Sequence, residues 1–239
     1  MYTTQVETAT LPVSRWLSEY RFPARFRDAC KACPDYGRVW SCPPGVPEAE
    51  AFFSPFSDVT LIAVRVIYSE ETRRAAASPE ETEQLRKRCY GTVKKQLLAT
   101  QLALEKQFPG TLSIAAGRCE QCERCTRPEG APCRMPDRLR YSFSAFGFDL
   151  GKLALEQLSI RLLWSMEGLP EYDTAMAAFF APLISISPCR GLPPCITYLS
   201  KLFDTSHAAK AERCRASAAA SGRTSCIACP ILTEPNNGL

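Results

Sequence analysis

The chain of 239 residues has one histidine, His207, and lacks the motifs on which several enzyme classes depend. A single histidine excludes an H-E-x2-H zinc site and leaves a Ser–His–Asp arrangement with only His207 to draw on. Neither a G-x4-G-K-S/T phosphate loop nor a G-x-G-x2-G dinucleotide fingerprint occurs. No cysteine cluster has the C-x3-C-x2-C spacing of radical S-adenosylmethionine enzymes. His207 has no motif partner, and we expect it at the surface.

Long apolar runs are also absent. The longest, residues 175–186, is too short for a membrane span and contains Pro182. The first 20 residues lack the basic and apolar regions of a signal peptide. A net charge of +4, from 29 basic and 25 acidic residues, is too mild to indicate a nucleic-acid partner. We therefore expect a cytoplasmic protein that binds neither nucleic acid nor membrane.

Cysteine, in contrast, is abundant. Thiols are normally kept reduced in the cytosol, so thirteen cysteines favour metal binding or redox chemistry over disulfides. They form an N-terminal set, a middle set and a C-terminal set, with Cys89 alone. The sets are Cys30, Cys33 and Cys42; Cys119, Cys122, Cys125 and Cys133; and Cys189, Cys195, Cys214, Cys226 and Cys229.

The middle set is the best-supported metal site. Its C-x2-C-x2-C run places three sulfurs in one tight loop, as in ferredoxin-type iron–sulfur sites, and Cys133 follows after seven residues. Pro136 comes three residues after Cys133, which departs from the ferredoxin C-x3-C-P ending. We expect Cys119, Cys122, Cys125 and Cys133 to bind an iron–sulfur cluster, [4Fe–4S] in type.

A zinc site is the alternative, since four-cysteine zinc sites also use C-x2-C pairs. Zinc usually takes two pairs separated by a longer span, whereas cysteines at i, i+3 and i+6 are more typical of iron–sulfur proteins. The surrounding arginines either offset the negative charge of a thiolate cluster or form a solvated basic surface. They are Arg118, Arg124, Arg127 and Arg134.

The N-terminal set predicts a second metal loop with three thiolate ligands, Cys30, Cys33 and Cys42. Tyr36 and Trp40 lie between them and are expected to form an apolar cover. A fourth ligand could come from Cys89, a cysteine of another cluster, water or a substrate. Cys89 is better explained as a small core residue on a helix. Buried free cysteines beside aromatic core residues are the alternative to this metal loop.

These two patterns resemble a known family. C-x2-C-x2-Tyr-Gly-x2-Trp-x-Cys-Pro-Pro, followed by C-x2-C-x2-C-x7-C-Arg-x-Pro, is similar to the predicted metal-binding proteins grouped as domain of unknown function 2284, over about residues 15–160. The resemblance implies a small cytosolic metal-binding protein, with iron–sulfur clusters and no established reaction. It implies ligand roles for Cys30, Cys33, Cys42, Cys119, Cys122, Cys125 and Cys133.

One departure from the family follows the second motif. The family pattern Ser-Met-Glu-Ala-x-Gly-Ile-Asp corresponds here to residues 142–149, in which Gly147 and Asp149 are kept and Ser144 replaces the acid. A ligand or acid–base role at position 144 is therefore not expected in this chain.

The fold is expected to be α/β or α+β, with a small sheet. Residues 58–68 and 111–116 read as strands, and 79–107 as a long helix with Ser78 as its N-cap. This is a β-α-β unit, for which parallel pairing of the strands is the default. A helix over 142–160 and a strand over 181–187 would follow.

Two regions are expected from composition. Residues 1–187 would form the cysteine-rich metal-binding domain, and 188–239 a weakly ordered tail rich in Pro, Ala and Ser. The five C-terminal cysteines have no regular spacing, and we do not expect them to bind metal.

These patterns favour a redox accessory protein that passes electrons through one or two clusters to a redox protein or enzyme partner. The alternative is a cysteine-ligated zinc protein that acts as a scaffold or interaction module. A third possibility is an enzyme that binds its substrate at an open iron of the N-terminal site. Whether the chain is an enzyme is left open, because no catalytic motif accompanies the cysteines.

Overall fold

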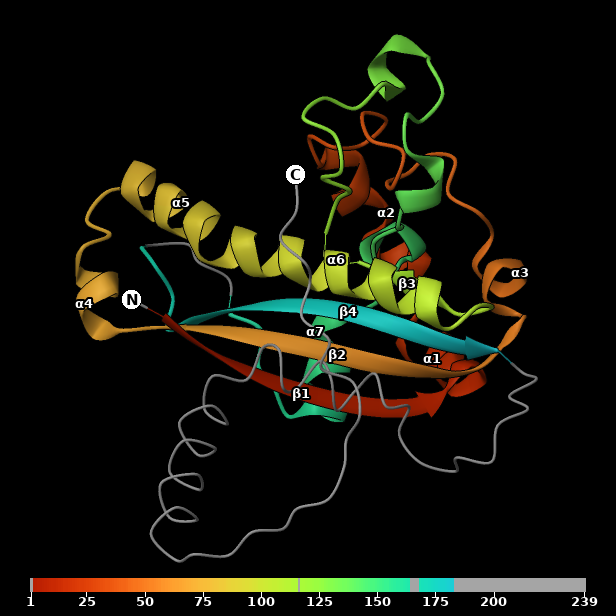
Figure 1. Ribbon diagram of the computed structural model, residues 1–239, viewed down its shortest axis with the longest axis horizontal. Helices are drawn as coiled ribbons and strands as arrows, with labels where there is room; N and C mark the ends of the chain where they lie inside the picture. Colours follow the sequence, from red (N-terminus) through yellow and green to blue (C-terminus); the bar gives the residue numbers. More distant parts are fainter. Residues whose placement is uncertain (1, 116, 164–167, 183–239) are drawn as a thin grey trace, which may run out of the picture.

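The computed structural model describes residues 2–115, 117–163 and 168–182. A four-stranded sheet lies at its base, helices cover both faces, and two loops project from one side (Figure 1). The strands are β1 (Tyr2–Pro12), β2 (Phe56–Tyr68), β3 (Leu112–Ile114) and β4 (Tyr172–Pro182). The fold is mixed α/β, as the sequence predicts.

The sheet has the order β1-β2-β4-β3, and every neighbouring pair is antiparallel. β2 and β3 run parallel to each other, but β4 lies between them. The expected direct pairing of the β-α-β strands is therefore wrong. The long antiparallel pairing of β2 with β4 separates them, and β4 follows β3 by more than fifty residues.

β2 forms because its Val- and Ile-rich sequence suits a strand buried on both faces. Val59 to Val64 are all buried along the centre of the sheet. β1 occupies the edge, and sequence reasoning did not find it. Its segment contains four Thr, one Gln and one Glu and is mostly half-buried, so it lacks a strong apolar pattern.

The helix expected at 79–107 is confirmed, with a bend. It comprises α5 (Pro79–Arg88) and α6 (Tyr90–Gln107), joined at Cys89. Ser78 caps its start, where a capping box with Glu81 satisfies two backbone N–H groups. Gln101 then fastens α6 to the sheet, because its buried Nε2 donates to carbonyls of both β3 and β4.

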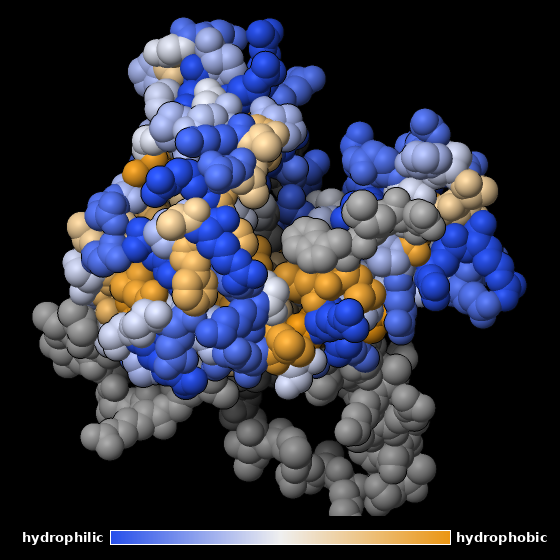
Figure 2. Space-filling view, turned by 180° about the vertical axis from the view of Figure 1, so that it is seen from behind, coloured by the Kyte–Doolittle hydropathy of each residue, from blue (hydrophilic) through white to orange (hydrophobic). Residues whose placement is uncertain are grey.

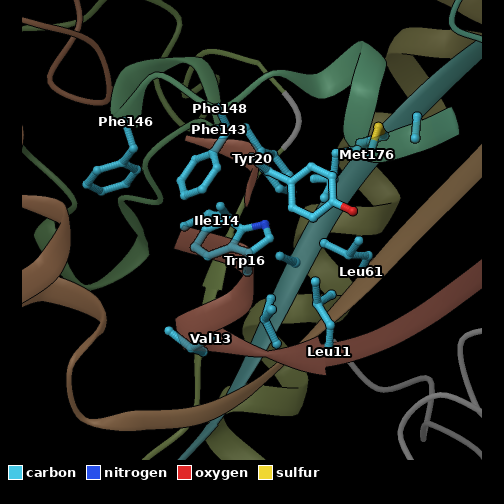
Figure 3. Packing of buried hydrophobic residues seen from close by; sticks show 14 of the residues in the cluster. Leu11, Val13, Trp16, Tyr20, Leu61, Ile114, Phe143, Phe146, Phe148 and Met176 are labelled. Carbon is cyan, nitrogen blue, oxygen red and sulfur yellow. The ribbon is translucent and has the colours of Figure 1, made fainter. Parts of the chain in front are cut away.

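The first face of the sheet packs against α1 (Val13–Tyr20), α3 (Ala49–Phe53) and α7 (Leu150–Leu158). Trp16 is completely buried at the centre of this core (Figure 3). It stacks on Phe148 at 3.7 Å between ring centroids and meets Phe53 and Phe180 edge-on.

The second face packs against α5 and α6. Val93, Leu97 and Leu104 of α6 contact the β2 and β4 side chains that point away from the first core. The side of α6 that carries these three residues is therefore the buried side of the helix. Short helices connect these layers: α2 (Pro23–Ala32), α4 (Glu70–Arg74) and the 3₁₀ turns Arg127–Glu129, Pro136–Arg138 and Ser144–Phe146.

Two expected elements differ. The helix expected at 142–160 is confined to α7, because Gly147 adopts a left-handed backbone conformation with φ +80° and Asp149 begins a new helix. The strand expected at 181–187 is β4, which starts earlier, at Tyr172. Residues 183–187, like the tail expected at 188–239, lie outside the described residues.

None of the helices in the described ranges is long and apolar enough to cross a membrane.

Candidate metal centre

Both cysteine-rich segments lie at the same end of the molecule. We define the cysteine head as residues 30–46 and 117–139, which stand beside each other above the sheet (Figure 1). Its surface is largely hydrophilic (Figure 2). Segments almost ninety residues apart in sequence therefore share one substructure, which neither spacing pattern predicts alone.

The middle set converges on one pocket. Its four thiols line that pocket together with Thr126, Met135 and Leu139, and each cysteine is half-buried. The eight cysteines within the described ranges are free thiols, with no disulfide among them. The four cysteines expected as ligands, Cys119, Cys122, Cys125 and Cys133, therefore lie around a common space.

These thiols surround a space without converging on one point. Within the part of the chain that the structure describes, no three Cys, His, Asp or Glu side chains are arranged to hold a single metal ion.

The N-terminal loop folds through a series of tight turns. Cys33 N donates to Cys30 O, Cys42 N donates to Val39 O, and Gly37 N closes the loop on Pro43 O at 2.8 Å. Gly37 has φ +69°, a conformation that glycine adopts without strain. These turns bring Cys30, Cys33 and Cys42 into one short loop.

Cys30 is placed by helix α2. This helix packs so closely on Gly147 that a Cβ there would lie 2.5 Å from Pro23 Cα. Asp149 caps α7 and also pairs with Arg25 of α2 at 2.9 Å. Gly147 and Asp149 thus hold α2 in position. The Cys30 thiol then lies 3.6 Å from the backbone oxygen of Ser144, so position 144 borders the N-terminal set.

A buried serine joins the two loops. Ser41 Oγ accepts a 2.8 Å hydrogen bond from the backbone N of Cys119 and lies 3.9 Å from Cys42 Sγ. Cys42 Sγ and Cys119 N are therefore no farther apart than the sum of 3.9 and 2.8 Å. The two thiol sets are neighbours.

Arg127, in the second loop (residues 117–139), donates hydrogen bonds to the first loop (residues 30–46). Its guanidinium donates to Val39 O at 2.7 Å, to Cys42 O at 2.5 Å and to Pro44 O, and it lies over the Trp40 ring at 5.1 Å. Five donors in a planar fork suit such a set of carbonyls. Sequence reasoning grouped Arg127 with its neighbours, and its structural role has no distinct sequence signal.

The other arginines of the head also bind protein groups. Arg118 pairs with Asp35 of the first loop at 2.9 Å, Arg134 donates to the Arg124 carbonyl, and Arg124 lies near Glu129 at 3.6 Å. Asp35 also raises the pKa of Cys42 through its charge, although burial raises that pKa more. Asp35 and Ser41 are neighbours of the thiols that sequence reasoning missed, because neither belongs to a recognised spacing.

Burial raises the pKa of Cys30, Cys42 and Cys119 above the ordinary value of a thiol. Metal-free, these side chains are therefore protonated at neutral pH. Binding a soft metal would release their protons, and the affinity would fall as the solution becomes more acidic.

The remaining cysteines have different locations. Cys89 is 5% exposed in the second core, beside Leu85 and Val93, so it packs as the helix stripe indicates and does not join the N-terminal set. The C-terminal cysteines and His207 lie outside the described residues. They are Cys189, Cys195, Cys214, Cys226 and Cys229.

The donor chemistry of the head fits a thiolate-bound metal group. Thiol sulfur is the ligand of choice for zinc, Cu(I) and iron–sulfur clusters. The middle set offers four such donors around one pocket, and the N-terminal set offers three.

Residues 17–179 match the family described as "Predicted metal-binding protein (DUF2284)". The match covers more than half of the chain and extends beyond the expected 15–160 to include β4. Neither a curated protein nor a solved structure matches the sequence. The chain belongs to this family of predicted metal-binding proteins.

Proposed function

We propose that this family member carries a [4Fe–4S] cluster on Cys119, Cys122, Cys125 and Cys133 and acts as an electron-transfer accessory protein. Cys30, Cys33 and Cys42 would hold a second metal group. The observation that supports the proposal is the arrangement of the middle set: its four cysteines, three of them in a C-x2-C-x2-C run, line one pocket.

A cluster bound there would supply one-electron oxidation and reduction. The protein contributes the two loops that hold the thiols. Ser41 and Arg127 join the second loop to the first through hydrogen bonds. Close thiol sets allow an electron to pass between two metal groups in one head.

The half-buried thiols of the middle set suit this role. Burial limits access of water to the sulfurs, while the position of the head at one end of the molecule leaves it open to a protein partner (Figure 1). We propose a redox protein or an enzyme as that partner, and the cytoplasm as the compartment, since free thiols persist there.

Anaerobic purification followed by iron, sulfide and zinc analysis tests the metal. We expect iron and acid-labile sulfide, a brown colour that dithionite bleaches, and an electron paramagnetic resonance signal of the reduced protein. Cys122→Ala should remove the signal of the middle site, and Cys89→Ala, in the second core, should leave the iron content unchanged. Stoichiometric zinc without iron or sulfide would refute the cluster and support a zinc scaffold.

A further inference from the structure

Trp40 belongs to the N-terminal loop but lines the pocket of the middle cysteines. From sequence it was expected to cover its own loop. Its indole Nε1 is buried and has no hydrogen-bond partner among the described residues. A buried N–H donor without an acceptor loses its hydration without compensation, so such a group is rarely left unpaired.

Trp16 provides a contrast within the same molecule. Its Nε1 is also buried without a conventional partner, but its ring is packed among phenylalanines. Aromatic faces accept weak N–H···π bonds. The pocket at Trp40 is lined instead by four cysteines, so most of the side-chain acceptors in it are sulfur atoms. The remaining side-chain acceptors belong to Gln121 and Thr126.

Arg127 holds the Trp40 ring in place. Its guanidinium lies 5.1 Å from the ring centre and is itself anchored to Val39 O and Cys42 O. The cation withdraws electron density from the indole and makes its N–H a stronger donor. Thr126 Oγ1 donates its proton to Pro132 O, and its lone pairs are the other acceptor that the indole N–H has to be distinguished from.

We propose that Trp40 Nε1 donates a hydrogen bond to a sulfur of the metal site formed by Cys119, Cys122, Cys125 and Cys133. This inference rests on the proposed function. Trp40 is a positioning residue: its N–H stabilises the more negative, reduced form of the site and thereby raises its reduction potential. One loop would then set the redox behaviour of the site held by the other.

The sharpest test removes the N–H and keeps the ring. Trp40→β-(3-benzothienyl)alanine replaces the indole nitrogen with sulfur, and the same replacement at Trp16 is the matched control. We expect the midpoint potential to fall in the Trp40 variant and to stay at the wild-type value in the Trp16 variant. Circular dichroism and iron content verify that each variant is folded and loaded, and Trp40→Phe provides a second variant.

Protein labelled with ¹⁵N at the indole nitrogens gives an independent readout. Pulsed electron paramagnetic resonance of the reduced protein should show a ¹⁵N coupling that Trp40→Phe abolishes and Trp16→Phe retains. A loaded protein with unchanged potential and no such coupling overturns the inference and leaves the proposed function intact. A protein without iron and sulfide overturns both.

Discussion

The sheet-and-helix base and the cysteine head are held together by different forces. In the base, large side chains such as Trp16, Phe53 and Phe180 are fully buried, and apolar packing dominates. In the head, most side chains are half-buried or exposed, and the loops are joined by hydrogen bonds from Ser41 and Arg127. The base is therefore held by apolar packing, whereas the described contacts within the head are mainly polar.

The largest expected effect is in the base. Trp16→Ala removes a fully buried ring that contacts four aromatic neighbours, so we expect a loss of about 3–5 kcal/mol in the free energy of unfolding. Urea unfolding followed by circular dichroism measures it. Leu155→Ala, at an exposed position of α7, is the control. A loss below 1 kcal/mol at Trp16 would mean that the base is not the stable part.

The second prediction separates the head from the base. Arg127→Met leaves the Val39, Cys42 and Pro44 carbonyls without their donor, and we expect a cost of about 2–3 kcal/mol confined to the head. Hydrogen exchange should show faster exchange at residues 117–139 and unchanged protection in β2 and β4.

Arg124→Met is the matched control for this prediction, because Arg124 is 79% exposed and its ion pair with Glu129 is long. It should leave exchange in both regions unchanged. Uniform loss of protection across the sheet in Arg127→Met would contradict a separate head.

The third prediction concerns the stability of the sheet-and-helix base at alkaline pH. Burial raises the pKa of Tyr90 to about 12, above its value of 10.0 in an unfolded chain. Because Tyr90 loses its proton less readily in the folded state, its contribution to the free energy of unfolding is constant below pH 10. That contribution is lost as the pH rises toward 12. The loss is on the order of 2 kcal/mol. In urea unfolding at pH 9, 10.5 and 11.5, the free energy of unfolding should fall less for Tyr90→Phe than for the wild-type protein. Equal falls in the two proteins would exclude Tyr90 as the cause.

The smallest effect is expected at the junction of the two loops. Ser41→Ala removes the buried acceptor of the Cys119 N–H, at a cost of about 1–2 kcal/mol. Metal affinity of the middle site, measured by competition with a chelator, should fall by roughly tenfold for each 1.4 kcal/mol. Ser54→Ala, on the surface of the base, should change neither quantity. Unaltered affinity in Ser41→Ala would show that the loops position their thiols independently.

Local patterns were sufficient where nearby residues decide the structure. The apolar run of β2 and the N-cap Ser78 placed β2 and the long helix close to their observed bounds. Other elements were missed because distant partners decide them. β1 is a strand because it pairs with β2 along its length, although its own sequence is largely polar.

The sequence by itself determined the identity and spacing of the candidate thiol ligands, and with them the family, because a ligand pattern depends on residue type and short separations. Only the tertiary structure decided that the two cysteine loops are neighbours, that Arg127 and Ser41 join them, and that Trp40 of one loop enters the pocket of the other. These contacts join residues 78 or more positions apart. No local pattern records such a placement.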